Sequence, residues 1–244
     1  MVEANVPEMH SLGDAGLLIS WGNEISRELN EKVTSLAKAL RDKPFEGFVD
    51  CVPAYSSLAV LYDISALHHA IAKSSSGYEW VKSYMEDLLL NTAKTESTGS
   101  MLIEVPVCYD ESLDNDLTTI SDAMQIAKEE IIALHTGRTY HVYMPGFIPG
   151  FVYMGEVDGR IAIPRKQKPV PVKPGAVGVA GIQTGIYPSV SPGGWHIVGY
   201  TPYQLFDASA TDDPCLLHAG DTVQFVAVCI DDYHKMKKEM EHGN

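Results

Sequence analysis

The segment that most restricts the fold reads Gly175-Ala-Val-Gly-Val-Ala-Gly-Ile-Gln-Thr-Gly-Ile-Tyr-Pro188, and Ser191-Pro-Gly-Gly-Trp195 follows it. Glycine and proline separate short valine, isoleucine and aromatic runs here. The same texture extends over residues 135–206, which hold 12 of the 20 glycines and 9 of the 14 prolines. Many short apolar runs between turn residues are typical of a small barrel or sandwich. We therefore expect a mainly-β domain in the C-terminal part of the chain.

The glycine spacing does not predict a nucleotide site. Gly175, Gly178 and Gly181 form a G-x-x-G-x-x-G pattern, and no amphipathic helix follows to hold a pyrophosphate. The sequence also lacks a P-loop motif and the G-x-S-x-G motif of serine hydrolases. Glycine instead allows a ligand to approach the backbone, and nearby polar side chains can orient a small substrate. These side chains are Gln183, Thr184, Tyr187 and Ser191. The alternative is that the glycines only form the corners of a small barrel.

Charge is distributed unevenly along the chain. The whole protein carries a net charge of −14, which argues against binding to nucleic acid or to anionic membranes. Residues 135–206, however, hold six basic and two acidic side chains. Four of these cations lie in residues 164–173, where prolines stiffen the backbone, and they are Arg165, Lys166, Lys168 and Lys173. This pattern predicts a site for a carboxylate or phosphate, and the alternative is a solvated loop that offsets the acidic surface.

Histidine and aromatic residues give weaker signals. His135 precedes a turn, where it is a candidate general acid or base, and the alternative is a structural histidine at a helix C-terminus. No spacing of the nine histidines is typical of a metal site, so we expect no metal. Phe147, Phe151 and Tyr153 are either pocket walls or core residues.

In the first hundred residues, predicted strands alternate with predicted helices. Residues 15–20 form a predicted strand, and an apolar stripe from Ile25 to Leu40 predicts a helix capped near Asn23. A hairpin over 47–62 and a second helical region from Ser65 complete a β-α-β-β-α order, which is typical of a split βαβ unit. The polar residues 92–100 indicate a linker. We expect an α+β domain over residues 1–95 and a β-barrel domain over 96–244.

The second domain should also contain a strand at 101–107, one or two helices within 117–134 and a buried strand at 221–230. No stretch is apolar and long enough to be a membrane helix, and the N-terminus lacks the basic and apolar regions of a secretory signal. We therefore expect a cytoplasmic protein without a membrane partner.

Four ordered motifs together resemble one family. They are Gly146-Phe-Ile-Pro-Gly-Phe-Val-Tyr-Met-Gly155, Pro164-Arg165-Lys166, Gly178-Val-Ala-Gly-Ile-Gln-Thr-Gly-Ile-Tyr-Pro188 and Ser191-Pro-Gly-Gly-Trp195. The chain resembles the KipI/PxpB family, also described as allophanate hydrolase subunit 1 or as carboxyltransferase subdomains C and D. The resemblance implies an N-terminal α+β domain and a C-terminal barrel similar to cyclophilin.

The resemblance also implies a reaction and partners. Bacterial members resemble the PxpB component of an ATP-dependent 5-oxoprolinase, which works with PxpC-like and PxpA-like subunits to convert 5-oxo-L-proline, ATP and water to L-glutamate, ADP and phosphate. ATP would be bound by the complex, and this chain alone would be inactive. Under this hypothesis Arg165, Lys166 and Lys168 bind the anion, Gln183, Thr184, Tyr187 and Ser191 orient the substrate, Trp195 shapes the wall and His135 is catalytic.

Two other functions fit the same resemblance. One is a KipI-like inhibitor of a sensor histidine kinase. The other is the C/D half of a biotin-dependent carboxyltransferase that acts on urea or a related amide. The chain lacks an Ala-Met-Lys-Met biotin-attachment sequence, although another chain can supply that sequence. The substrate and the stoichiometry do not follow from the sequence.

Overall fold

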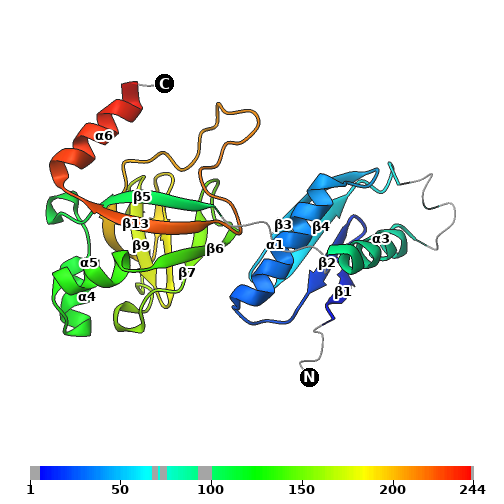
Figure 1. The fold of residues 1–244 in the computed structure, drawn as a ribbon, viewed down its shortest axis with the longest axis horizontal. Coiled ribbons are helices and arrows are strands. Elements are labelled where there is room, and N and C mark those ends of the chain that lie inside the picture. Colours follow the sequence, from blue (N-terminus) through cyan, green and yellow to red (C-terminus); the bar gives the residue numbers. More distant parts are fainter. Residues whose placement is uncertain (1–5, 68–70, 72–75, 93–100, 243–244) are drawn as a thin grey trace. The chain divides into compact units, whose positions relative to one another are not determined.

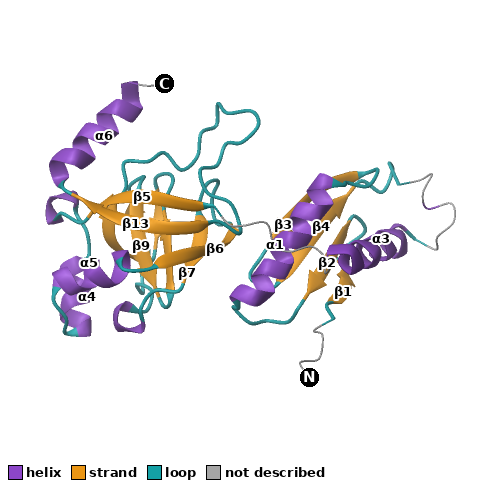
Figure 2. Ribbon diagram, in the orientation of Figure 1, coloured by secondary structure: helices purple, strands orange, loops and turns teal. Residues whose placement is uncertain are grey.

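The computed structural model describes residues 6–67, 71, 76–92 and 101–242. The chain divides into two compact units, Met1–Gly99 and Ser100–Asn244 (Figure 1). The first unit combines a small sheet with helices, and the second is built around a closed barrel (Figure 2). The predicted fold class is thereby confirmed. The predicted linker, and with it the boundary at residue 95, lies outside the described residues apart from Thr92.

The sheet of the first unit has four strands in the order β1-β2-β4-β3, each antiparallel to its neighbours. β4 lies between β2 and β3, so these two strands run parallel to each other and form the expected split βαβ unit. The sequence pattern does not predict β1, because that strand has one apolar residue, Met9. The bounds are Glu8–Ser11 (β1), Gly16–Ser20 (β2), Phe48–Pro53 (β3) and Ser57–Tyr62 (β4).

Two helices share one core with this sheet. Helix α1 (Arg27–Asp42) begins after Ser26, whose hydroxyl accepts a hydrogen bond from the backbone N–H of Leu29 at 3.4 Å. The cap is therefore Ser26 rather than Asn23 or the residue before it. Helix α3 (Gly77–Thr92) contributes to the same apolar core. The buried side chains from the two helices include Leu29, Val33, Leu36, Leu40, Val81 and Met85.

The second unit closes seven strands into a barrel in the order β10-β7-β6-β13-β5-β12-β9. β5 and β13 are parallel, and the other neighbouring strands are antiparallel. Two short strands, β8 (Val170–Val172) and β11 (Ser191–Gly193), form a separate sheet. The barrel strands are Leu102–Cys108 (β5), Thr139–Pro145 (β6), Val152–Gly155 (β7), Ala176–Ala180 (β9), Gln183–Ile186 (β10), His196–Tyr200 (β12) and Thr222–Val228 (β13).

Short helices accompany the barrel. Helices α4 (Leu117–Met124) and α5 (Lys128–Thr136) occupy the segment for which one or two helices are predicted, and α6 (Ile230–His242) follows the last strand. Two 3₁₀ turns, η1 (Glu111–Leu113) and η2 (Gly159–Ile161), connect other elements. Within the described residues, no helix combines the length and the apolar composition needed to cross a bilayer.

Side chains alternate between two packing layers along β9 and β10. Val177, Val179 and Ile186 belong to the core inside the barrel. Ala176, Ala180 and the aromatic residues Tyr187 and Trp195 belong to a second cluster. Because successive strand residues face opposite sides of a sheet, this second cluster lies on the outer surface of the barrel.

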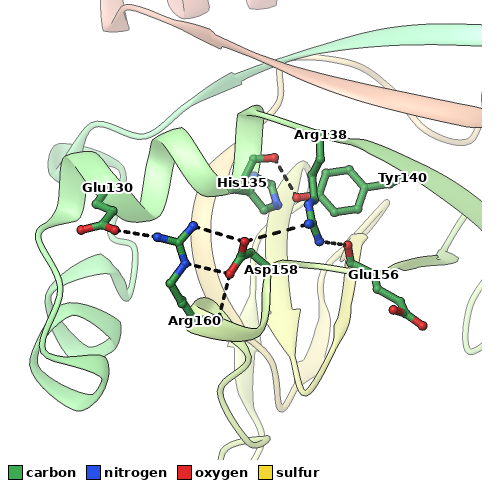
Figure 3. Close-up of polar contacts among 7 residues, drawn as sticks. All are labelled: Glu130, His135, Arg138, Tyr140, Glu156, Asp158 and Arg160. Carbon is green, nitrogen blue, oxygen red and sulfur yellow. Dashed lines mark hydrogen bonds and ion pairs between the residues drawn. The ribbon is translucent and has the colours of Figure 1, made fainter.

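His135, a predicted site residue, lies in the barrel interior and has no exposed surface. Its ring stacks on Phe225 with centroids 4.5 Å apart. The hydroxyl of Tyr140 donates a hydrogen bond to the carbonyl oxygen of His135 at 2.8 Å (Figure 3). His135 is therefore held in the core by both its ring and its backbone.

Hydrogen bonds determine the tautomer of this histidine. The hydroxyl of Thr184 donates to the carbonyl oxygen of Gly178 at 3.0 Å, so its oxygen accepts from Nε2 of His135, which lies 3.1 Å away. The other ring nitrogen, Nδ1, then accepts from the hydroxyl of Tyr109 at 2.8 Å. This pattern assigns a neutral imidazole protonated on Nε2. Burial lowers the pKa of His135 to about 3, which favours the same neutral form.

These contacts revise the interpretation of two predicted site residues. His135 and Thr184 are fully buried, and both ring nitrogens of His135 already bond to protein groups. A substrate atom therefore has no ring nitrogen to contact in this structure. The geometry favours a structural role for His135 over the predicted catalytic role, and a structural role for Thr184 over substrate orientation.

The buried histidine predicts a pH-dependent stability. Its pKa in the folded chain is below the unfolded value of about 6.5, so the unfolded chain binds a proton first as the pH falls. Stability is therefore lost between about pH 6.5 and pH 3. Between about pH 7.5 and pH 5 this group should lower the free energy of unfolding by on the order of 2 kcal/mol. Denaturant titrations at both pH values measure the change.

Replacing His135 with Gln should remove that contribution, so the variant should lose less stability over the same interval. His10→Gln, at an exposed histidine of the other unit, is the control for the loss of an imidazole. An equal loss of stability in the wild type and His135→Gln would contradict the assignment.

Candidate functional site

The six cations of residues 135–206 fall into two groups. The first group lies near α5 and η2, where Arg160 pairs with Asp158 and Glu130, each at 3.0 Å (Figure 3). Arg138 donates to the carbonyl oxygen of Glu156 at 2.7 Å and lies 4.0 Å from Asp158. The hydrogen bonds from Arg160 lower the pKa of Asp158. Because these two arginines are matched by acidic groups, they are poor candidates for binding a further anion.

The second group is the cationic segment, residues 164–173. Its strand β8 pairs with β11, which places Val172 opposite Ser191 and Val170 opposite Gly193. The backbone N–H of Lys166 donates to the carbonyl oxygen of Gly194 at 2.7 Å. The structure therefore brings the cationic segment together with the Ser191–Trp195 motif, which the sequence presents as separate signals.

The cations of this segment differ in their partners. Nζ of Lys166 lies 2.7 Å from Oδ2 of Asp116, and Nζ of Lys173 lies 3.9 Å from Oδ2 of Asp114. Within the described part of the chain, no carboxylate lies within ion-pair distance of Arg165 or Lys168. Both of these side chains belong to exposed residues. They are therefore the cations of the segment that are most available to a ligand.

Arg165 lies over glycine backbone. A β-carbon added at Gly194 would come within 3.6 Å of Nη2 and 3.7 Å of Nε of Arg165. The guanidinium thus covers the buried Gly194, where the lack of a side chain lets it approach the backbone. Its positive charge also acts on the hydroxyl of Tyr187, whose pKa is raised by burial and lowered in smaller measure by a backbone hydrogen bond from Trp195 and by Arg165.

Tyr187 belongs to a set of five rings in mutual contact, which we call the aromatic cluster: Phe147, Phe151, Tyr153, Tyr187 and Trp195. Phe151 contacts each of the others edge to face, with centroids 5.0 to 5.6 Å apart. Phe147 is 55% exposed and has a φ of 67°, a left-handed conformation that is rare for a bulky residue. An exposed ring held in a strained conformation is typical of a functional surface. The alternative for Phe151 and Tyr153, core packing, agrees with the burial of Phe151 and the partial burial of Tyr153.

Polar groups of the site are buried beside the cations. Oγ of Ser191 and Nδ1 of His196 are buried and have no hydrogen-bond partner among the described residues. Burial lowers the pKa of His196, as does the charge of Lys166, whereas the charge of Asp116 raises it. The imidazole therefore lies within the field of the Lys166–Asp116 pair.

The remaining predicted residues do not all reach this surface. Gln183 is half-buried at the start of β10, opposite Gly155 of β7, and Thr184 lies in the barrel core. Tyr187, Ser191 and Trp195 are buried next to the cationic segment. The structure thus brings together Arg165, Lys166, Tyr187, Ser191 and Trp195, and it separates Thr184 and His135 from them.

Sequence reasoning misses two groups of this site. Asp116 pairs with Lys166 although 50 positions separate them in the sequence, and no local motif marks this contact. His196 follows Trp195 directly, but its apolar surroundings suggest only a strand residue. The position of Asp116 just before the predicted helix at 117 suggests an N-cap residue, and it does not predict an ion pair.

The arrangement is suited to anion recognition. An unpaired guanidinium can form two parallel hydrogen bonds to a carboxylate or phosphate, and the adjacent rings can contact an apolar ligand body. Among the described residues, no group of three or more His, Cys, Asp or Glu side chains could hold a metal ion. The described geometry therefore provides groups for binding and orienting a small anion.

Comparison with known proteins adds three findings. The chain is 41% identical over 234 residues to the B-type subunit of 5-oxoprolinase from Bacillus subtilis, covering 95% of this chain and 97% of that protein. It is similar to the solved structure of TTHA0988, with a TM-score of 0.73 and 33% identity, covering 87% of this chain and 40% of that one. It also shares the fold of Kluyveromyces lactis urea carboxylase, with a TM-score of 0.69 and 17% identity, covering 96% of this chain and 23% of that one.

The chain thus spans nearly the whole B. subtilis relative but less than half of TTHA0988. A family model described as "Carboxyltransferase domain, subdomain C and D" matches residues 7–217. This match includes all four motifs on which the resemblance rests and confirms that prediction. The chain therefore belongs to the family of carboxyltransferase domains, subdomains C and D.

Proposed function

We propose that the chain is the PxpB-type component of an ATP-dependent 5-oxoprolinase complex. The observation that carries the proposal is the 41% identity to a 5-oxoprolinase component of B. subtilis, which extends over nearly the full length of both chains. The complex would convert 5-oxo-L-proline, ATP and water to L-glutamate, ADP and phosphate. The anion-binding geometry around Arg165 supports the proposal, because 5-oxo-L-proline carries one carboxylate.

The reaction requires activation of a stable bond. Resonance makes the lactam of 5-oxoproline resistant to water, and transfer of the γ-phosphoryl group of ATP to the lactam carbonyl oxygen would weaken it. Water would then add to the activated carbon, the ring C–N bond would break, and phosphate would leave as the second carboxylate of glutamate forms. Electrostatic stabilisation of the added negative charge is the usual protein contribution to such a step.

Part of this task would fall to the present chain. Arg165 would hold the substrate carboxylate in a bidentate contact, and Lys168 would add a second positive charge. The exposed ring of Phe147 would contact the apolar face of the lactam, and the buried Trp195 would support the wall behind it. Lys166 is a weaker candidate for anion binding than the sequence suggests, because Asp116 already neutralises it.

Other chains would complete the site. This sequence has no P-loop, and its one candidate catalytic histidine lies in the barrel core. We therefore assign ATP binding and the hydrolytic step to the complex with PxpC-like and PxpA-like subunits, in which this chain is one member of a hetero-oligomer that is inactive without its partners.

A second function is favoured by the family match itself. The matched model describes a carboxyltransferase subdomain, and urea carboxylase has the same fold. In that case the same anion site would hold a carboxylated carrier or an amide substrate, and biotin would be attached to another chain. The two functions differ in whether turnover requires biotin and bicarbonate.

Reconstitution distinguishes the candidate functions. We expect 5-oxoproline-dependent release of ADP and glutamate when this chain is mixed with PxpA-like and PxpC-like partners, and none when any one chain is omitted. The measurement is coupled ADP detection together with amino-acid analysis of glutamate. Urea-dependent and bicarbonate-dependent turnover would instead support the carboxyltransferase. Inhibition of a sensor kinase without turnover in any mixture would support the KipI-like inhibitor.

Arg165→Ala tests the anion site within the active complex. Loss of charge-assisted hydrogen bonds to a carboxylate should raise the KM for 5-oxoproline by on the order of 10- to 100-fold. Arg165→Lys should recover part of the loss, because an ammonium keeps the charge but not the bidentate geometry. Steady-state kinetics at saturating ATP measure both values.

The matched control is Lys173→Met, which removes a cation of the same segment that is exposed and lies 3.9 Å from Asp114. It should leave the KM within about twofold of wild type. An unchanged KM in Arg165→Ala, with the complex still assembled, would remove Arg165 from the anion site.

A further inference from the structure

Asp116 occupies the N-cap position of α4 but does not cap it. Aspartate at this position usually accepts a hydrogen bond from a backbone N–H of the first helical turn. No such bond forms from its side chain, and the neighbouring Asn115 accepts from the N–H of Leu117 at 3.2 Å instead. The carboxylate of Asp116 is therefore used elsewhere.

That carboxylate connects two elements of the candidate site. Oδ2 of Asp116 accepts a hydrogen bond from the backbone N–H of Ile197 at 2.7 Å and lies 2.7 Å from Nζ of Lys166. The backbone N–H of Asp116 donates in turn to the carbonyl oxygen of Ile197 at 2.6 Å. Asp116 is thus bonded to the start of β12 through both its side chain and its backbone.

The same contacts lead to Arg165. Lys166 follows Arg165 directly, and its backbone N–H donates to Gly194, over which the guanidinium of Arg165 lies. Ile197 is three residues beyond Gly194. The carboxylate of Asp116 therefore binds both Lys166, the residue after Arg165, and β12, the strand that follows Gly194.

We propose that Asp116 is a positioning residue that holds Arg165 in place for anion binding by clamping Lys166 to β12. The inference rests on the proposed function for its effect on substrate, but its structural part concerns this chain alone. Lys166 contributes through this clamp rather than by contacting the anion.

The burial of the pair indicates that it orders the segment. The side chains of Lys166 and Asp116 are only 20% and 23% exposed, whereas those of the neighbouring pair Lys173 and Asp114 are 68% and 86% exposed. Ion pairs that are shielded from water and supported by a further hydrogen bond contribute more than exposed pairs. Asp114 therefore offers a matched control in the same loop, facing the same cationic segment.

Three variants of the full chain separate the clamp from general stability. Asp116→Asn keeps an oxygen for the N–H of Ile197 but removes the charge for Lys166, and Asp116→Ala removes both. Asp114→Asn removes an exposed carboxylate at a left-handed position, φ 61°, that asparagine tolerates. Circular dichroism and thermal unfolding establish that each variant is folded.

The first measurement needs no substrate and no partner. In Asp116→Ala, amide hydrogen exchange should accelerate by on the order of tenfold in peptides containing Lys166 and Ile197 and remain unchanged elsewhere. Labelling of Arg165 by phenylglyoxal, followed by mass spectrometry, should become severalfold faster, with Arg27 of the other unit as internal reference. Asp114→Asn should match wild type. Wild-type exchange and labelling in a folded Asp116→Ala would overturn the proposal.

The second measurement uses the reconstituted complex. Asp116→Asn should raise the KM for 5-oxoproline by on the order of tenfold and leave kcat nearly unchanged, and Lys166→Met should do the same. The double variant should be no worse than either single variant, because both remove one interaction. Additive losses would overturn the clamp. If the wild-type complex does not turn over 5-oxoproline, the proposed function fails, whereas exchange and labelling still decide the role of Asp116.

Discussion

The candidate site depends on the direct packing of aromatic rings on the backbone of the barrel. A β-carbon at Gly178 would lie 3.0 Å from Cβ of Trp195, and one at Gly185 would lie 2.9 Å from Cζ of Phe151 and 3.0 Å from Cζ3 of Trp195. The glycines on β9 and β10 are therefore needed as spaces for the rings, not as a nucleotide loop. With Trp195 seated there, Gly194 and the paired strands β8 and β11 are fixed beside it, and the cationic segment follows.

Close contacts continue through the two-stranded sheet. At Gly193 a β-carbon would lie 2.4 Å from Cγ2 of Val172 and 2.9 Å from the hydroxyl of Tyr187. Any side chain there would push β8 away from β11 and move the cations with it. The geometry of the proposed anion site is thus a consequence of backbone packing, which determines where the charged residues lie.

The main features of the fold follow from local patterns, whereas the division of roles within the site does not. The 3.6-residue apolar period identifies α1, and the density of glycine and proline indicates the barrel. In β10, however, Thr184 and Ile186 face the interior, whereas Tyr187, the next residue after β10, lies in the aromatic cluster. A short strand that contains glycine gives no alternation of apolar and polar residues from which to assign these faces. The partnership of Asp116 with Lys166 is likewise invisible, because it depends on tertiary contacts between distant segments.

The two faces of the Gly178–Pro188 motif explain why its polar residues have different roles. Thr184 links His135 to the backbone of β9 inside the barrel and allows a histidine to be buried as a neutral, fully bonded group. On the outer side of the same strand, Gly185 makes room for Phe151 and Trp195, and Tyr187 lies within the field of Arg165. The interior hydrogen bonds and the outer aromatic contacts are thus made by neighbouring residues of one strand. A substitution inside the barrel can therefore disturb the proposed anion site from a distance, whereas Arg165→Ala changes that site and leaves the interior unchanged.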